Sequence, residues 1–455
     1  MTAPRRLAVR TVGTLSVLVA TAMLGSSGAC AASATSATSA TTPVQHLVVM
    51  TQDAHSFDNY FGTRAGADGI PGGVCVPERV GVAAPCVAPF SLVAAGLHPT
   101  LKNTAAAQAA SETGGTMNGF VAAQTTGRVD GTAAMGYYRP SDLPVTSELA
   151  DQGVLFDRWF SAEPGGGIAN RLFAISGVAS PEAAHVPSSG WPDRPVIFDR
   201  LQAAGVTWKV YVENYEPALS LKTAGRTELR GGQVARVPLL AMARYENDPA
   251  LLAHVADLDT YYADLAAGRL PAVSWIVTTA STERPPTDPS VGQRAVRSVV
   301  NALEESSAWG SSAFLLTYDS SGGWYDHVRP PAEKGYSLGL RVPTILVSPL
   351  AAAGAVDHTQ LDSSSVLSFI ERNWSLRPLS DRDAAAPNLL SAFSFQAAPR
   401  AAAVVGLVEH APAQAQPKRL IIYATYLAAV LLALLVVGWA AAGSRRYLRA
   451  PEVPA

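Results

Sequence analysis

The chain has 455 residues, enough for one large α/β domain or two modest ones, so its size is no obstacle to an enzyme. It carries 34 Lys and Arg against 36 Asp and Glu and shows no basic stripe with interleaved aromatic residues, which argues against a nucleic-acid partner. Charged residues make up only 15%, a bias explained by two terminal apolar stretches and many alanines.

The N-terminal residues 1–31 have the layout of a secretory signal peptide. Three arginines precede an apolar run from Val12 to Leu24, and small residues then offer cleavage after Ala31 or Ala34. Residues 32–43 are Ala, Ser and Thr repeats without large apolar side chains, so we expect a flexible tether. These features predict an exported protein.

The C-terminal region predicts a membrane anchor. Residues 399–418 are rich in Ala, Pro and Gln and are expected to form a linker. The uncharged, mostly aliphatic stretch Leu420–Gly443 has a length that suits one crossing, which predicts a transmembrane helix over 419–443 and a cytoplasmic tail over 444–455. With a cleaved signal peptide, residues 44–398 would form an extracytoplasmic domain of a single-pass cell-membrane protein.

Two of the three cysteines lie in the body of the chain. Cys75 and Cys86 flank a segment with Pro and Gly that is typical of a loop. In an oxidising compartment this spacing predicts a local disulfide, and two unrelated buried thiols are the alternative.

Between the ends, short β-rich apolar runs alternate with helical stretches. This alternation is typical of a mostly parallel sheet with helices on both faces. The expected strands are His46–Met50, Trp208–Val212, Val273–Val277, Ala313–Tyr318 and Thr344–Val347, and Ser364–Asn373 is expected to be a helix. Sites in such sheets lie beyond the carboxyl ends of the strands, so the polar residues there are the candidates for chemistry.

Carboxylates follow two of the expected strands. Asp53 comes after the first and Asp319 after the fourth, with Asp326 and His327 close behind. Such side chains suit a divalent cation that polarises a phosphoryl group. The alternatives are structural: Asp53 as a helix cap, and Asp319 as a residue that holds the Gly322-Gly323 turn.

A series of sequence blocks over about residues 44–395 resembles, in the same order, the bacterial phosphoesterase family that includes phosphatidylcholine-type phospholipases C and acid phosphatases. The blocks are HLVVMTQDAHSFDNYFGT, TMNGFV, MGYY, DRWFSAEPGGGIANRLFAISG, LPAVSWIV, TERPPTDPSVGQ, FLLTYDSSGGWYDHVRPP, GLRVPTILVSP and VDHTQLDSSSVLSFIERNW. The resemblance implies an alkaline-phosphatase-like α/β fold. It also implies cleavage of phosphate esters by a Ser or Thr nucleophile at a metal site.

At the family's catalytic positions the chain carries several substitutions. The position of the nucleophile, aligned through the Asn170-Arg171 pair, is Gly167, which has no side chain to attack phosphorus. The family's Glu-Asn pair in the first block is Asp53-Ala54 here.

Further substitutions follow along the chain. The family's Glu-His pair is Glu283-Arg284, its Asp-Glu pair is Asp319-Ser320, and its later Asp-His pair is Asp362-Ser363. Arginine stays protonated, so Arg284 replaces a potential ligand with a positive charge. The remaining site candidates are Asp53, Arg284, Asp319, Ser320, Asp326, His327 and His358, of which Asp53, Asp319 and His358 are the expected ligands of a divalent metal, if one is bound.

These substitutions favour a membrane-anchored, degenerate phosphoesterase with impaired or lost hydrolysis and a role in binding or surface organisation. The alternative is an active phosphoric ester hydrolase in which a metal activates water and Arg284 holds the phosphate. A purely structural surface protein is a third class. In the first two cases the expected ligand is a phosphate ester or a phospholipid headgroup.

Overall fold

A computed structural model describes residues 38–95, 99–127, 130–180, 184–333 and 335–406, together with residues 432, 434, 435 and 439. The predicted signal peptide and cytoplasmic tail, and nearly all of the predicted transmembrane segment, lie outside these residues. In the part that is described, no helix has both the length and the apolar character needed to span a bilayer.

Both ends of the domain extend beyond the predicted boundaries. In the predicted tether, the Thr41 amide donates to the Asn373 carbonyl at 2.7 Å, and the Thr42 hydroxyl donates to the Asn373 side chain at 2.7 Å. In the predicted linker, Arg400 donates to the carbonyl of Ala351, and Val405 is buried. Residues 38–43 of the predicted tether and residues 399–406 of the predicted linker therefore contact the domain, whose groups satisfy part of their hydrogen bonding.

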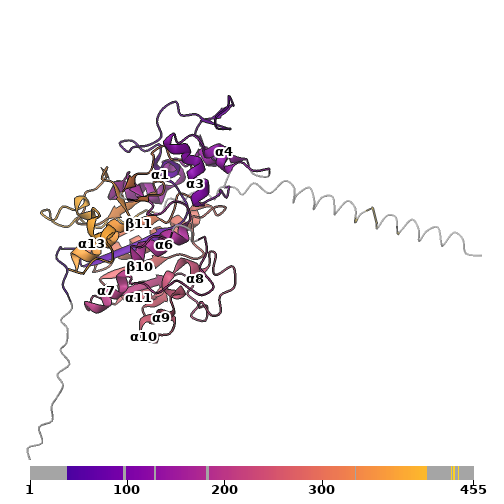
Figure 1. The fold of residues 1–455 in the computed structure, drawn as a ribbon. Helices are drawn as coiled ribbons and strands as arrows, with labels where there is room; N and C mark the ends of the chain where they lie inside the picture. The colour runs from indigo at the N-terminus through magenta and orange to yellow at the C-terminus, as the bar shows by residue number, and fades with distance from the viewer. Residues whose placement is uncertain are drawn as a thin grey trace, which may run out of the picture.

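An eight-stranded sheet forms the centre of the domain, with the order β15-β6-β14-β11-β1-β10-β8-β9 (Figure 1). Its strands are β1 His46–Gln52, β6 Val154–Phe156, β8 Trp208–Val212, β9 Val255–Asp257, β10 Val273–Val277, β11 Ser312–Tyr318, β14 Ile345–Val347 and β15 Ala355–Asp357. Neighbouring strands pair in parallel except at β14, which is antiparallel to both β11 and β6. The predicted mostly parallel sheet is confirmed.

Helices cover both faces of the sheet. The helices are α1 Phe57–Phe61, α2 Leu92–Ala95, α3 Ala105–Glu112, α4 Phe120–Gln124, α5 Pro144–Gln152, α6 Gly167–Ser176, α7 Ile197–Ala203, α8 Gln233–Arg236, α9 Ala243–Glu246, α10 Pro249–Leu252, α11 Asp259–Ala266, α12 Pro289–Glu304, α13 Ser363–Asn373 and α14 Asp381–Ala385. Val49 of β1 faces α6, α7 and α13, whereas Tyr211 of β8 faces the other way and contacts Tyr261 of α11 with ring centroids 5.4 Å apart. This alternation is the period-2 pattern of a strand buried on both sides.

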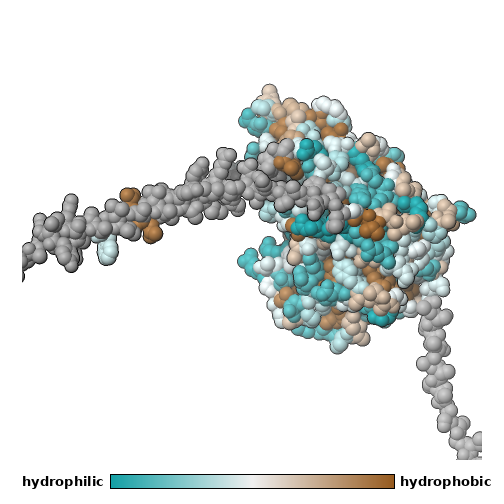
Figure 2. Space-filling model, turned by 180° about the vertical axis from the view of Figure 1, so that it is seen from behind, coloured by the Kyte–Doolittle hydropathy of each residue, from teal (hydrophilic) through white to brown (hydrophobic). Residues whose placement is uncertain are grey.

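Smaller elements complete the domain. They are the strands β2 Val76–Pro77, β3 Cys86–Val87, β4 Phe90–Ser91, β5 Gly136–Tyr137, β7 Trp159–Phe160, β12 Ala332–Glu333, β13 Tyr336–Ser337 and β16 Leu361–Asp362, and the 3-10 helices Thr113–Gly115, Gly131–Met135, Pro140–Asp142, Pro238–Ala241, Trp309–Ser311 and Leu389–Ala392. Cys75 and Cys86 form a disulfide with Cα atoms 5.4 Å apart, next to the β2–β3 pair. Hydrophilic and hydrophobic residues are interspersed over the face of the domain shown in Figure 2.

Candidate functional site

A cleft of about 500 Å³ opens beyond the carboxyl ends of β1 and β11. The two strands pair in parallel with Gln52 opposite Tyr318, so the residues that follow, Asp53 and Asp319, leave the sheet side by side. Both aspartates line the cleft together with the first turn of α6. Its size and its position at the strand ends make the cleft the candidate site.

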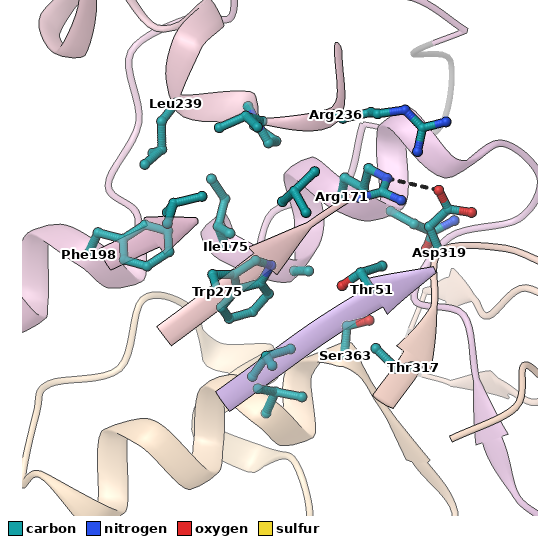
Figure 3. Close-up of a pocket in the computed structure, with 18 of the residues that line it drawn as sticks. Thr51, Arg171, Ile175, Phe198, Arg236, Leu239, Trp275, Thr317, Asp319 and Ser363 are labelled. Atoms are coloured by element: carbon teal, nitrogen blue, oxygen red, sulfur yellow. Dashed lines mark hydrogen bonds and ion pairs between the residues drawn. The ribbon is translucent and has the colours of Figure 1, made fainter. Parts of the chain in front are cut away.

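Arg171 of α6 bridges the two aspartates. Its Nη2 atom lies 2.9 Å from Oδ1 of Asp53, and its Nε atom lies 2.9 Å from Oδ2 of Asp319. All three side chains are buried. Figure 3 shows Arg171 beside Asp319, with apolar residues such as Ile175 and Trp275 lining the neighbouring cavity. One guanidinium therefore occupies the position between the carboxylates from the two strand ends.

A second guanidinium completes the environment of Asp53. Arg236, the last residue of α8, places Nη1 2.6 Å from Oδ2 of Asp53, and the hydroxyl of Thr282 donates to the same oxygen. Burial opposes ionisation of Asp53, but Arg236 and Arg171 overcome this effect and hold its pKa below the ordinary value. Asp53 is therefore an anion with all its charge compensated by arginines.

Asp319 has a different electrostatic environment. Besides Arg171, its carboxylate accepts from the Ser320 hydroxyl at 2.7 Å and from the Ala54 amide at 3.3 Å. Ser320 in turn accepts from Nδ2 of Asn103 at 2.9 Å. Burial raises the pKa of Asp319, Arg171 opposes this rise, and the charge on Asp53 adds to it. A carboxyl with a raised pKa at a cleft is suited to accept and release a proton.

The first turn of α6 packs directly against Asp319. A Cβ atom added to Gly167 would lie 2.2 Å from Oδ2 of Asp319, so no side chain fits at this position while Asp319 holds its place. Ala54 nearby has φ of 63°, a left-handed conformation that Asn and Gly adopt more readily than Ala. The two positions that the family resemblance assigns to a nucleophile and an amide therefore have no reacting side chain here.

The loop after β10 brings Thr282 and Arg284 to the cleft. Glu213, which follows β8, holds this loop by accepting from the backbone amides of Thr279, Ala280 and Ser281 at 2.9, 2.9 and 2.8 Å. Beneath the loop, Glu283 is buried, and both the Tyr60 and Tyr318 hydroxyls donate to its Oε2 atom at 2.6 Å. Burial raises the pKa of Glu283 to about 7.

Two further arginines line the cleft with their charges uncompensated. Arg230 and Arg284 are exposed, and in the described part of the chain their side chains make no hydrogen bond or ion pair. Arg284 lies near the backbone next to Arg230, since a Cβ on Gly231 would be 3.5 Å from Nη1 of Arg284. Among the described residues that line the cleft, four are arginines and two are aspartates, so this described lining carries a formal charge of +2. An anionic ligand suits this surface.

The residues of the cleft do not fit a divalent cation. Asp53 and Asp319 already accept hydrogen bonds from arginines, and a cation placed between them would meet the permanent charge of Arg171. The predicted third ligand, His358, lies elsewhere: its Nδ1 atom contacts Oδ2 of Asp157 at 2.8 Å, and its side chain is 63% exposed. The structure therefore does not bring the predicted ligands Asp53, Asp319 and His358 together.

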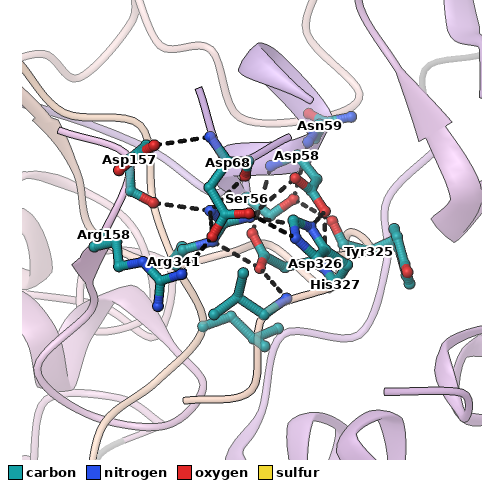
Figure 4. A network of polar contacts seen from close by, with 12 residues as sticks. Ser56, Asp58, Asn59, Asp68, Asp157, Arg158, Tyr325, Asp326, His327 and Arg341 are labelled. Carbon is teal, nitrogen blue, oxygen red and sulfur yellow. Dashed lines mark hydrogen bonds and ion pairs between the residues drawn. The ribbon is translucent and has the colours of Figure 1, made fainter. Parts of the chain in front are cut away.

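Asp326 and His327 belong to a second cluster, with Asp58 of α1 (Figure 4). Ligand atoms of these three residues lie within 4.8 Å of one another, so they form a possible metal-binding group. Arg341 donates to Asp58 and to Asp326, each at 2.9 Å, and its side chain is fully buried. A cation here would compete with Arg341 for both carboxylates.

Several residues of the cleft were not identified from the sequence as site residues. Arg171 lies in the family block DRWFSAEPGGGIANRLFAISG. That block was the sequence signal that could have identified Arg171 as a site residue. Thr282 likewise lies in one of the family blocks, TERPPTDPSVGQ. Arg230, Arg236 and Asn103 carry no such signal, because they reach the cleft from loops and short helices. Of the predicted candidates, Asp53, Arg284 and Asp319 line the cleft, and Ser320 supports Asp319 from behind.

Comparison with known proteins finds related phospholipases C. Non-specific phospholipase C6 of Arabidopsis thaliana is 28% identical over 83% of this chain and 77% of its own length. Phospholipase C B of Mycobacterium tuberculosis is 27% identical over 79% of each chain. Non-hemolytic phospholipase C of Pseudomonas aeruginosa is 28% identical over 84% of this chain, which spans 62% of that protein.

Among solved structures, a protein of the alkaline phosphatase superfamily from Vibrio parahaemolyticus is 13% identical, with a TM-score of 0.35, over 76% of this chain and 74% of that one. The model of the phosphoesterase family, in contrast, matches residues 44–377, which include both strands that border the cleft and the arginines that line it. The chain therefore belongs to the phosphoesterase family.

Proposed function

We propose that this protein is a phosphoester hydrolase whose substrate binds by its phosphate in the arginine-lined cleft. The observation that carries the proposal is the pair of exposed arginines, Arg230 and Arg284, which have no acidic partner among the described residues and border the cleft. Guanidinium groups recognise phosphate through charge-assisted, often bidentate hydrogen bonds. The family and the phospholipase C relatives support this function better than the impaired hydrolysis that the sequence favoured.

The proposed reaction is direct attack of water on phosphorus, since Gly167 offers no nucleophile. The P–O bond to the alcohol breaks as the bond to water forms, and the departing alkoxide takes up a proton from solvent or from Asp319, once that carboxyl has been protonated by the attacking water. Asp319 lines the cleft and has a raised pKa, which suits it to accept the proton from water. The guanidinium groups of Arg230 and Arg284 would stabilise the charge that develops on the phosphoryl oxygens. The names of the relatives favour a phospholipid diester as the substrate class.

A second candidate is phosphate-ester binding without turnover. Its specific support is the packing of Gly167 against Asp319 and the bridge that Arg171 makes between the two aspartates. In this arrangement three donors already bind the Asp319 carboxylate.

The test combines turnover and binding on the full-length protein in detergent. Hydrolysis of phosphatidylcholine and of p-nitrophenyl phosphorylcholine should fall at least about 100-fold in Asp319→Asn, because a general base contributes about 10² to 10⁴ in rate. Affinity for phosphocholine should fall about tenfold or more in Arg284→Gln and Arg230→Gln, since a hydrogen bond to a charged group contributes about 1.5–3 kcal/mol.

Arg226→Gln is the matched control, because Arg226 is exposed on the same segment as Arg230 but does not line the cleft. Turnover that survives in Asp319→Asn would point to a contaminating enzyme. Binding that depends on Arg284 without any turnover would support the second candidate. Failure to bind phosphocholine at all would remove both.

We also propose, as expected from the sequence, that the domain is held at the outer face of the cell membrane by the segment 419–443. The Cys75–Cys86 disulfide supports export, since such bonds persist in oxidising compartments. Protease added to intact cells should remove the domain. Protection until the membrane is permeabilised would contradict this orientation.

A further inference from the structure

We infer that the cleft binds its phosphate anion without a divalent cation, because Arg171 and Arg236 supply the positive charge that a metal ion would bring to Asp53 and Asp319. The inference rests on the proposed function for the identity of the ligand. It differs from that function in what it says about the cofactor, for which the family resemblance leads to the opposite expectation.

The first argument is geometric. The guanidinium of Arg171 contacts one oxygen of each carboxylate, at 2.9 Å in both cases, and Arg236 takes the second oxygen of Asp53 at 2.6 Å. The second oxygen of Asp319 accepts from Ser320 and from the amide of Ala54. Each carboxylate oxygen that faces the cleft therefore already has a donor, and a metal ion would have to displace them.

The second argument is electrostatic. Two buried carboxylates are balanced by two buried guanidinium groups, which cannot lose their protons at accessible pH. A divalent cation between the aspartates would leave Arg171 and Arg236 as buried charges without partners. Leaving buried charges unpaired is costly, and the cation would in addition give up its own hydration to enter the cleft.

The third argument concerns the ligand. With the inner four charges balanced, Arg230 and Arg284 are the free cations among the described residues of the cleft, in agreement with the formal charge of +2 on that lining. The α6 helix also begins at the cleft without a side-chain cap, so its first amides face the same space. A phosphate group can therefore be bound by protein donors alone.

The first experiment titrates Zn²⁺, Mg²⁺, Ca²⁺ and Mn²⁺ into metal-free full-length protein and into its Asp53→Asn and Asp326→Asn variants. Calorimetry measures the heat of binding, and thermal denaturation measures the melting temperature. We expect the wild type and Asp53→Asn to give the same isotherm for each metal. Asp326→Asn reports on cation binding at Asp58, Asp326 and His327, which the inference does not concern. Cation binding that is lost in Asp53→Asn but kept in Asp326→Asn would overturn the inference.

The second experiment measures the affinity for inorganic phosphate in a chelator and in each metal. The dissociation constants should agree within about twofold, which corresponds to a difference near the thermal energy. Binding that appears only with metal would overturn the inference while leaving the proposed function intact. If phosphate binds in neither condition, the proposed function fails, and the metal titration still decides whether a cation enters the cleft.

A gain-of-site variant gives a third readout. In Arg171→Met the two carboxylates lose their bridge, and we expect a divalent cation to raise the melting temperature of this variant by more than that of the wild type, in which any response comes from Asp58, Asp326 and His327. Equal metal responses of the two folded proteins would contradict the role assigned to Arg171. If the variant does not fold, the two experiments on the wild type still test the inference.

Discussion

Among the described residues, Arg341 and Arg171 each hold two buried carboxylates, and the comparison between these two clusters separates a structural cluster from a binding site. In the cluster of Arg341, Asp58 and Asp326, the guanidinium is fully buried and donates to both carboxylates at 2.9 Å. In the cleft, Arg171 makes the same kind of bridge between Asp53 and Asp319, also at 2.9 Å. The inner geometry of the two clusters is therefore alike.

The difference lies in what surrounds them. The Arg341 cluster is enclosed, and its further donors go to carbonyls of the protein, such as those of Asp68 and Asp157. The Arg171 bridge borders an open space with two uncommitted arginines, Arg230 and Arg284. An arginine–carboxylate pair by itself is therefore weak evidence for function, and the unpaired charges next to a cavity are what indicate a ligand.

The largest expected effect is the loss of folding stability when the arginine of the enclosed cluster is replaced. Arg341→Met should lower the free energy of unfolding by about 3–5 kcal/mol, because it leaves buried carboxylates without their partner. Chemical denaturation would measure this loss, and the folded fraction should keep its affinity for phosphate.

The control is Arg139→Met, since Arg139 is half exposed and pairs with Asp142 at the surface. Removing this ion pair should lower the free energy of unfolding by at most about 1 kcal/mol. Similar losses for the two variants would show that the enclosed cluster is not a major source of stability.

The next prediction concerns the pH dependence of stability and compares a buried carboxyl group that has arginine partners with one that has none. Arginines lower the pKa of Asp53, whereas burial without an arginine raises the pKa of Glu283 to about 7 from 4.5. Between pH 4.5 and about pH 7 the unfolded chain releases the Glu283 proton, whereas the folded protein keeps it. The contribution of Glu283 to the free energy of unfolding therefore falls as the pH rises through this range. The fall should be on the order of 3 kcal/mol.

Glu283→Gln should remove the pH-dependent contribution of Glu283 to the free energy of unfolding. Stability curves of the variant and the wild type, measured between pH 4 and pH 8 by denaturation, should diverge as the pH rises, with the variant gaining relative to the wild type. Parallel curves would show that Glu283 does not retain its proton in the folded state. The unpaired Oε1 atom of Glu283 agrees with a protonated carboxyl.

The smallest effect concerns the packing of the cleft. Gly167→Ser should destabilise the protein by about 1–3 kcal/mol, because its Cβ would press on Asp319 and disturb the bridge to Arg171. We expect no gain in hydrolysis from the new hydroxyl. A gain would mean that Asp319 moves aside and that the ancestral arrangement of the site is still accessible.

The matched control is Gly166→Ala. An added Cβ at Gly166 meets only the Asn103 carbonyl, at 3.4 Å, and the φ of Gly166 is −65°. This substitution should change the free energy of unfolding by no more than about 0.5 kcal/mol, as surface changes usually do.

The sequence alone determined the framework and part of the site. Short β-rich apolar runs predicted β1, β8, β10, β11 and β14 to within a few residues, and capping residues predicted α13, because these patterns are local. The rule that sites follow strand ends located Asp53 and Asp319, and motif order located Arg284. These predictions needed no knowledge of long-range packing.

Only the tertiary structure decided which groups meet in the cleft. Arg236 contacts Asp53 across 183 positions of the chain, from a four-residue helix without a distinctive pattern. His358, a predicted ligand, pairs instead with Asp157, because β15 lies beside β6 at the far edge of the sheet from β1. Ion pairs form between whichever charges the packing brings together, and local sequence patterns do not encode that proximity.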